Sequence, residues 1–254
     1  NVAVVTDQAQ PTTVSGVVMM GANDRSLIPV RSDRFGGLAT SLHTPMMTES
    51  FEGTTIHALR WTITATTMAA TQGTVAGLTV NSGNITTITT GYMAQTTKRF
   101  MKTQRSPMQA KFRARLNRVN NSVMELGFGD ASTFNGANTT GVYWQVTAAG
   151  VVQPVLTFNS VDTTGTNISG SLNTTDYYTF DVMFDDDEAI FVVQNTSTGL
   201  IINRQSLTLP VSAQRLLSAT AIPAMFRLYN TGSAPATAPN LFLTDIYVAA
   251  LDAN

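Results

Sequence analysis

Few residues in this sequence are suited to catalysis. The chain has no cysteine and only two histidines, His43 and His57, so a Ser-His-Asp triad would have to use one of them. No Gly-x-Ser-x-Gly turn offers a nucleophile, and the sequence contains neither a phosphate-cradling glycine loop nor a dinucleotide-binding fingerprint. We therefore expect a protein that is not an enzyme and that uses no cofactor.

Metal binding has one candidate segment. Four consecutive acidic residues offer the oxygen ligands that Ca²⁺ prefers. Consecutive side chains on a tight turn point in different directions, which hampers a closed ligand cage, and such a run is equally typical of a hydrated hairpin tip. We predict no metal site, and the calcium candidates are Asp185, Asp186, Asp187 and Glu188.

The segments that would position functional side chains alternate as β-strands do. In residues 110–119, Lys111, Arg113 and Arg115 fall on one face and apolar side chains on the other, which predicts a half-buried strand with a basic outer face. Residues 56–65 and 177–184 alternate in the same way. About ten to twelve such segments, separated by turn signals, follow residue 48 and predict an all-β sandwich or jelly roll.

Residues 1–47 have a different pattern. Prolines and glycines interrupt them too often for a helix or a long strand, so we predict an extended arm with at most a short hairpin, followed by a sandwich domain over 48–254. Apolar arm residues are costly to leave in water, so we expect the arm to lie on a neighbouring subunit or on its own domain. The expected assembly contacts are Val17, Val18, Met19, Met20, Leu27, Ile28, Val30 and Leu38.

Charge is sparse and unevenly distributed. Only 12% of the residues are charged, and no apolar stretch is long enough to predict a membrane span. Residues 53–124 hold nine Lys or Arg and no acid, whereas residues from Glu125 onward hold eleven acids and three arginines. A basic stretch fits nucleic acid, but aromatic stacking residues are few there. We favour pairing of the opposite charges within the chain or between copies, and predict neither a nucleic-acid nor a membrane partner.

The order of the predicted strands resembles that of the concanavalin A-like (laminin G-like) jelly rolls. Three segments carry the resemblance: QAKFRARLNRVNNSVMELGFGDAS (109–132), YYTFDVMFDDDEAIFVVQNTSTGLII (177–202) and the closing residues 224–251. The resemblance covers roughly residues 48–252. It implies a jelly-roll β-sandwich.

The same resemblance suggests which functions to test against the residues. Glycoside hydrolases of this family have acidic residues at alternate positions of one strand, in the pattern Glu-x-Asp-x-Glu. Two of these carboxylates point into one cleft. Here Glu125 and Asp130 are separated by a glycine-containing bend and no Glu-x-Asp-x-Glu occurs. Many such sandwiches bind glycans, which makes the adjacent Tyr143 and Trp144 candidate glycan contacts. One of the two should face outward, and the alternative for either is core packing.

The arm carries a second resemblance. Residues 16–40 resemble a short segment of tailed-bacteriophage virion proteins, with a turn at Gly21–Asp24, an apolar run at Ile28–Val30 and an Asp-x-x-Gly-x-Leu end at Asp33–Leu38. This implies a structural protein on the virion surface. We predict a capsid decoration (cement) protein that docks through its arm onto other virion proteins, of capsid or tail, and onto copies of itself. The alternative is a tail- or fibre-associated adhesion module that binds a host-surface glycan.

Overall fold

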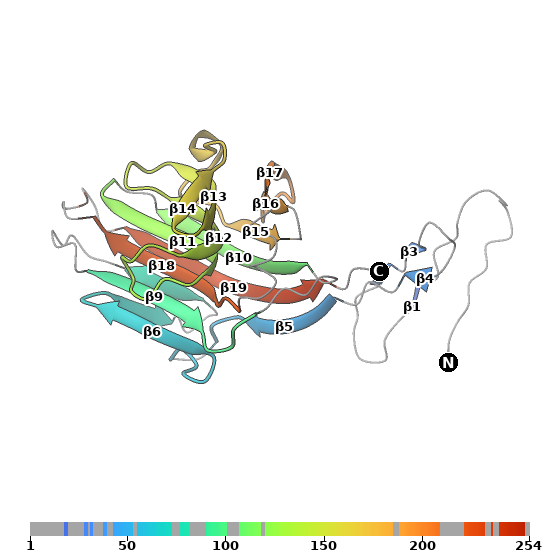
Figure 1. The fold of residues 1–254 in the computed structure, drawn as a ribbon, viewed down its shortest axis with the longest axis horizontal. Coiled ribbons are helices and arrows are strands. Elements are labelled where there is room, and N and C mark those ends of the chain that lie inside the picture. The colour runs from blue at the N-terminus through green and yellow to red at the C-terminus, as the bar shows by residue number, and fades with distance from the viewer. Residues whose placement is uncertain are drawn as a thin grey trace, which may run out of the picture.

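The computed structural model describes residues 43–52, 55–72, 77–81, 90–100, 107–117, 120–184, 188–208, 221–231, 235 and 239–251, together with four short strands nearer the N-terminus. This part of the chain consists of antiparallel strands and one 3-10 turn, η1 (Ser169–Ser171). Two sheets stack face to face (Figure 1), which confirms the predicted β-sandwich. Among the described residues, no helix is long and apolar enough to cross a membrane.

One layer is an eight-stranded sheet. Its strands run in the order β17-β16-β15-β10-β19-β8-β7, and β5 pairs with the free part of β19 beside β8. Strand β5 extends across residues 47 and 48, where the sequence predicts the end of the arm. The strands are β5 (His43–Glu49), β7 (Ala69–Gln72), β8 (Leu78–Asn81), β10 (Met108–Asn117), β15 (Tyr178–Phe184), β16 (Glu188–Asn195), β17 (Ile201–Thr208) and β19 (Asn240–Leu251).

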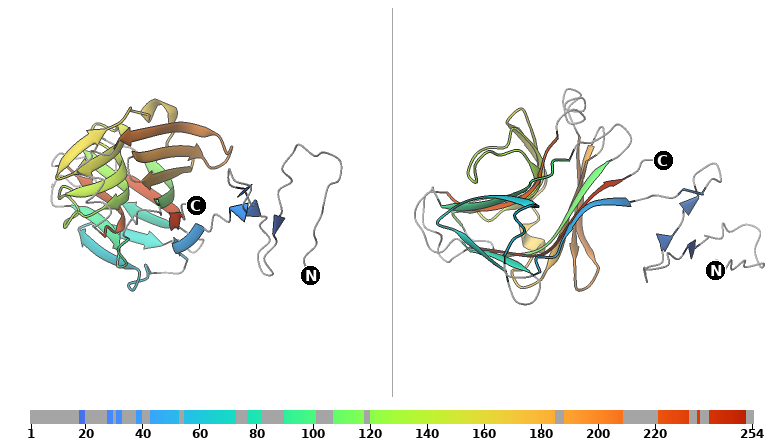
Figure 2. Two further views of the ribbon diagram at one scale, coloured as in Figure 1. Left: turned by 45° about the vertical axis from the view of Figure 1, so that its right-hand side comes forward. Right: turned by 90° about the horizontal axis from the view of Figure 1, so that it is seen from below.

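The other layer is a seven-stranded sheet in the order β14-β13-β12-β11-β18-β9-β6. It curves strongly at its β12–β14 end, which is visible in the right-hand view of Figure 2. The strands are β6 (Trp61–Thr66), β9 (Gly91–Thr96), β11 (Ser122–Gly129), β12 (Thr140–Val146), β13 (Val152–Phe158), β14 (Val161–Thr164) and β18 (Ala224–Asn230).

The core lies between the two sheets and follows the alternation of the strands. Strand β15 buries every second residue, and β10 buries its apolar positions while Lys111, Arg113 and Arg115 point outward, as the sequence predicts. Aromatic rings fill the interior: the ring of Trp144 lies 5.6 Å from that of Phe191. Burial of these rings supplies much of the driving force for the packing of the two sheets.

One predicted strand is shorter than expected. The alternation in residues 56–65 predicts a strand that places Leu59 on the same face as Trp61, but β6 begins only at Trp61. The carbonyl oxygen of His57 accepts hydrogen bonds from the backbone N–H groups of Arg60 (2.9 Å) and Trp61 (3.1 Å). These bonds close a turn, which leaves Leu59 83% exposed.

The N-terminal region contains two short strand pairs. Strand β1 (Val18–Met19) pairs with β2 (Ile28–Pro29), and β3 (Arg31–Ser32) pairs with β4 (Leu38–Ala39), both antiparallel. Of the expected assembly contacts, Val18, Met19, Ile28 and Leu38 lie in these strands, and Val17, Met20, Leu27 and Val30 lie outside the described residues.

Candidate binding site on the outer face of the seven-stranded sheet

A row of three polar side chains crosses the middle of the seven-stranded sheet on the face turned away from the core. Glu125 of β11 stands directly opposite Gln145 of β12 on one side and Arg227 of β18 on the other. Their neighbours along each strand face inward, because side chains alternate across a strand. Two consecutive strands and a third that is distant in the sequence thus bring these residues together.

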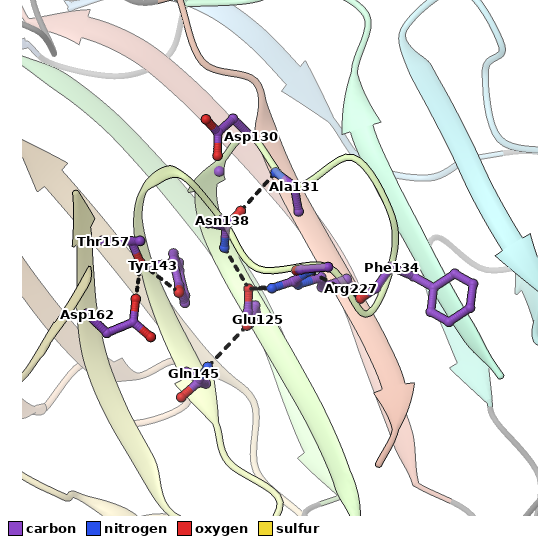
Figure 3. A network of polar contacts seen from close by, with 12 residues as sticks. Glu125, Asp130, Ala131, Phe134, Asn138, Tyr143, Gln145, Thr157, Asp162 and Arg227 are labelled. Carbon is purple, nitrogen blue, oxygen red and sulfur yellow. Dashed lines mark hydrogen bonds and ion pairs between the residues drawn. The ribbon is translucent and has the colours of Figure 1, made fainter. Parts of the chain in front are cut away.

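Glu125 and Arg227 form a buried ion pair (Figure 3). Their side chains are 1% and 2% exposed, and Nε and Nη2 of Arg227 each lie 2.7 Å from Oε2 of Glu125. The carboxylate also accepts hydrogen bonds from Nε2 of Gln145 (3.1 Å) and Nδ2 of Asn138 (3.2 Å). Burial raises the pKa of Glu125, and the three partners oppose this rise. Three side chains, Arg227, Gln145 and Asn138, thus hold the carboxylate in place.

Arg227 also fixes the loop between β11 and β12, residues 130–139, which we call the pocket loop. Its Nη1 donates to the carbonyl oxygens of Thr133 (3.4 Å), Phe134 (3.2 Å) and Gly136 (2.6 Å). One guanidinium thus joins the loop to the floor of the sheet. Because all three acceptors are backbone carbonyls, it determines the path of the loop rather than the position of single side chains.

Two further side chains fasten the ends of the pocket loop (Figure 3). Oδ1 of Asp130 accepts from the backbone N–H groups of Thr139 (2.7 Å) and Thr140 (2.9 Å). Oδ1 of Asn138 accepts from the N–H of Ala131 at 3.0 Å. The loop is thereby closed on itself, and it forms a preorganised wall beside the polar row.

A hydroxyl relay lies on the other side of Glu125. The hydroxyl of Thr157 donates to Oδ1 of Asp162 at 2.6 Å and lies 2.9 Å from the hydroxyl of Tyr143. A threonine hydroxyl has a single proton, so Tyr143 is the donor to Thr157. Burial raises the pKa of Tyr143 above its ordinary value and that of Tyr229 to about 12. Both phenols therefore stay protonated above the pH at which a tyrosine in contact with water ionises.

These groups surround a pocket of about 230 Å³ on the outer face of the sheet. The ion pair and Asn138 form its base, and the pocket loop forms one wall. Its exposed rim is made by Asn135, Ser160 and Asp162. The half-buried or buried walls are made by Tyr143, Gln145 and Tyr229.

The strand that carries Glu125 leaves no room for a second carboxylate. The positions two and four residues further along the same face are Gly127 and Gly129. A Cβ atom at Gly127 would collide with the carbonyl oxygen of Val142 and with Tyr143, and one at Gly129 would collide with Met225 and Asn138. Asp130, the other acid singled out in the sequence, caps the pocket loop.

The predicted aromatic pair is divided between the two faces of β12. Tyr143 faces outward and lines the pocket, although its side chain is only 2% exposed. Trp144 faces the core, where it packs against Phe180 and Phe191 and its Nε1 donates to the backbone carbonyl of Asp181 at 3.1 Å.

The basic strand face belongs to the other sheet and does not contribute to the pocket. Lys111 lies 3.6 Å from Asp181, and Arg113 lies 3.6 Å from Asp245. Arg115 stacks over the ring of Phe242 at 4.0 Å. Two of the three cations thus meet acids of the same chain that come from the acidic part of the sequence.

Only one residue of the acidic run at positions 185–188 lies within the described residues. Asp185, Asp186 and Asp187 lie outside the described residues, and Glu188 is the first residue of β16. Among the residues that the structure describes, no group of three or more histidine, aspartate or glutamate side chains is arranged to hold a metal ion.

The sequence interpretation missed Arg227, Gln145, Asn138 and Asp162. One signal was available, because Glu125 and Arg227 each interrupt an otherwise apolar segment, MEL and MFRL, and a buried charge requires a partner. The pairing of these two segments was not visible, since they lie about a hundred residues apart and their register depends on the sheet.

No protein-family model matches the chain, and no curated protein matches its sequence. Among solved structures, it is similar to the CBM2 module of the evolved Dit of Lactobacillus casei BL23 phage J-1, with 10% identity, 83% of this chain and 96% of that chain covered, and a TM-score of 0.56. It is similar to a beta-1,3-glucanase from Mycobacterium marinum, with 9% identity, coverages of 82% and 99%, and a TM-score of 0.57.

A third similar structure is Rv0315, an immunostimulatory antigen and pseudo beta-1,3-glucanase of Mycobacterium tuberculosis, with 9% identity, 81% of this chain and 98% of that chain covered, and a TM-score of 0.58. At this level of identity the three similarities establish the fold. They confirm the concanavalin-like jelly roll expected from the order of the strands.

Proposed function

We propose that this protein is a non-catalytic glycan-binding module and that a sugar binds in the pocket on the seven-stranded sheet. The observation that carries the proposal is the combination of a rigid polar base with exposed hydrogen-bonding groups at the rim. Sugars are recognised by hydrogen bonds to their hydroxyl groups and by contact of the ring with aromatic side chains. Asp162 and Gln145 supply the first, and Tyr229 the second.

The size and rigidity of the pocket support this reading. Its volume of about 230 Å³ lies below the range of pockets that enclose drug-sized ligands, and it suits a single sugar ring. Arg227 and Asn138 hold the pocket loop through backbone contacts. A wall that is already ordered does not lose conformational entropy when a ligand binds, which favours affinity for a small ligand.

The absence of catalysis is also part of the proposal. Hydrolysis of a glycosidic bond needs one carboxyl group that can give a proton and a second that acts as base or nucleophile. The carboxylate of Glu125 accepts hydrogen bonds from Arg227, Gln145 and Asn138 and is 1% exposed. It has neither the access to solvent nor the freedom to exchange a proton with a bound sugar.

The setting that we propose is the surface of a virion. The similarity to a module of a phage Dit and the resemblance of residues 16–40 to phage virion segments both support it. Of the two roles predicted from the sequence, adhesion is the one for which the described residues offer a site. Capsid decoration through the arm stays a prediction, because half of its expected contacts lie outside the described residues.

A glycan array probed with the full chain tests the proposal. We expect binding to a defined set of glycans, loss of that binding in Tyr229→Ala, and retention in Tyr247→Ala. Tyr247 is a matched control because it is a half-buried tyrosine of β19 in the other sheet. Bound oligosaccharides should be recovered uncleaved. Failure to bind any glycan, or release of new reducing ends, would contradict the proposed function.

A further inference from the structure

The charges around the pocket favour one class of sugar. Resting on the proposed function, we infer that the pocket selects an uncharged sugar, held through a pair of its hydroxyl groups by Asp162, and that it excludes sugars carrying a carboxylate or sulfate. The inference rests on how the charges and hydrogen-bonding groups of the lining are already used within the protein.

Among the described residues that line the pocket, Arg227 is the only cation, and its ion pair and hydrogen bonds are all within the protein. Nε and Nη2 of Arg227 bind Glu125, and its Nη1 binds carbonyl oxygens of the pocket loop. The charge of the guanidinium is balanced by the carboxylate at 2.7 Å, and its side chain is 2% exposed. An anionic sugar entering the pocket would therefore find no unpaired cation among the described lining residues.

The remaining charge at the pocket is negative. Asp162 is an exposed residue of β14 at the rim, and within the described part of the chain it forms no ion pair. Its Oδ1 accepts the hydroxyl of Thr157, which leaves Oδ2 to a ligand. A carboxylate has about four acceptor sites, so it can receive two neighbouring sugar hydroxyls in addition to Thr157.

Several hydrogen-bonding groups of the pocket also favour a ligand that donates hydrogen bonds. The hydroxyls of Tyr143 and Thr157 both donate within the protein, from Tyr143 to Thr157 and from Thr157 to Asp162. One N–H of the Gln145 amide donates to Glu125, and its carbonyl oxygen is an acceptor for a ligand. Asp162 and Gln145 thus present acceptor oxygens to a ligand, and acceptor oxygens bind hydroxyl donors and repel carboxylate or sulfate oxygens.

The test compares glycans before and after a carboxylate is introduced. Neutral glucans, galactans and mannans that bind the full chain are compared with the same glycans after oxidation of the C6 hydroxyl to a carboxylate. We expect affinity for the oxidised forms to fall on the order of tenfold, and the loss to shrink at high salt because screening weakens the repulsion. Asp162→Asn should reduce the discrimination to about twofold, whereas the exposed-acid control Glu52→Gln should leave it unchanged.

Equal or tighter binding of the oxidised glycans would overturn the inference while leaving the proposed function intact. Unchanged discrimination in Asp162→Asn would also overturn it, since the selection would then arise elsewhere. If the protein binds neither neutral nor oxidised glycans, the proposed function itself fails, and the inference fails with it.

Discussion

Glu125 and Arg227 are 102 residues apart in the sequence, yet they form a two-nitrogen ion pair at 2.7 Å on the outer face of a β-sheet. The outer face of an antiparallel sheet is usually in contact with water. Here the pocket loop covers the pair, so that all eight residues of β11 are buried. Polar side chains on this face are therefore buried as well. The stability of this region depends on each buried charge having its partner.

Removing one partner of this pair should be costly. We expect Arg227→Met to lower the free energy of unfolding by about 3–5 kcal/mol, because it leaves the Glu125 carboxylate buried without a counter-charge. The double variant Glu125→Leu/Arg227→Met should lose less than the single variant, since no charge remains buried. Urea denaturation followed by fluorescence measures both. The control is Arg113→Met, whose exposed pair with Asp245 should contribute no more than about 1 kcal/mol.

A side chain at Gly127 should destabilise the protein. The Cβ of Gly127→Ala would meet backbone atoms of Val142 and Tyr143, which cannot move aside without disturbing the pairing of β11 with β12. We expect a loss of at least about 1–3 kcal/mol, seen as a lower melting temperature. Gly170→Ala is the matched control, because a Cβ there meets no atom within 4 Å. Equal melting temperatures for the two variants would show that the strand tolerates a side chain at this position.

The pH dependence of stability should reflect Tyr229. Its pKa in the folded protein is raised to about 12 by burial, whereas an unfolded tyrosine ionises near ~10. The folded state therefore favours the protonated phenol, and this contribution is complete below pH ~10 and is lost as the pH rises towards 12. The melting temperature should fall less steeply over this range in Tyr229→Phe than in the unmodified protein.

The ionisation itself can be followed by absorbance at about 295 nm after a rapid pH jump, before the protein unfolds. The difference between the unmodified protein and Tyr229→Phe should contain one phenol that ionises near pH 12. A difference curve centred at the ordinary tyrosine value would show that Tyr229 is in contact with water.

The pocket loop should open when its cap is removed. Asp130→Ala deletes the acceptor of the Thr139 and Thr140 N–H groups, so hydrogen exchange at these two amides should accelerate by at least about tenfold, while the fold is retained. The amide of Ile168 donates to the carbonyl of Val152 and serves as an internal reference. Uniform acceleration of all three amides would instead indicate global destabilisation.

The sequence predicts the layers of this protein better than its site. The alternation in β10 and β15 identifies the buried face of each strand, because solvent and core lie on opposite sides of the sheet there. The same rule gives no information for β11, where a loop covers the outer face and burial no longer alternates. The segment containing Leu59 shows a second limit, since a local turn ends an alternating pattern without any proline or glycine.

The pocket depends on the register between paired strands, which the sequence does not show, and on β18, which comes from a distant part of the chain. Gln145, Glu125 and Arg227 become neighbours only through the pairing of β12, β11 and β18. Asp162 reaches the rim because β14 folds back on β13. Each residue alone is an unremarkable polar side chain in a strand or turn, so the chemistry of the site appears only when the sheet is assembled.

The order of the strands also has a consequence for how the protein is made. Strand β18 lies between β11 and β9 in one sheet, and β19 lies between β10 and β8 in the other. The last two strands of the described residues thus each occupy an interior position of one layer. A growing chain that has not yet reached residue 221 cannot complete either sheet. The edges of the earlier strands that pair with β18 and β19 then have no partner. We therefore expect the sandwich to fold only after β18 and β19 have been synthesised, and a chain cut short before them to be prone to aggregation.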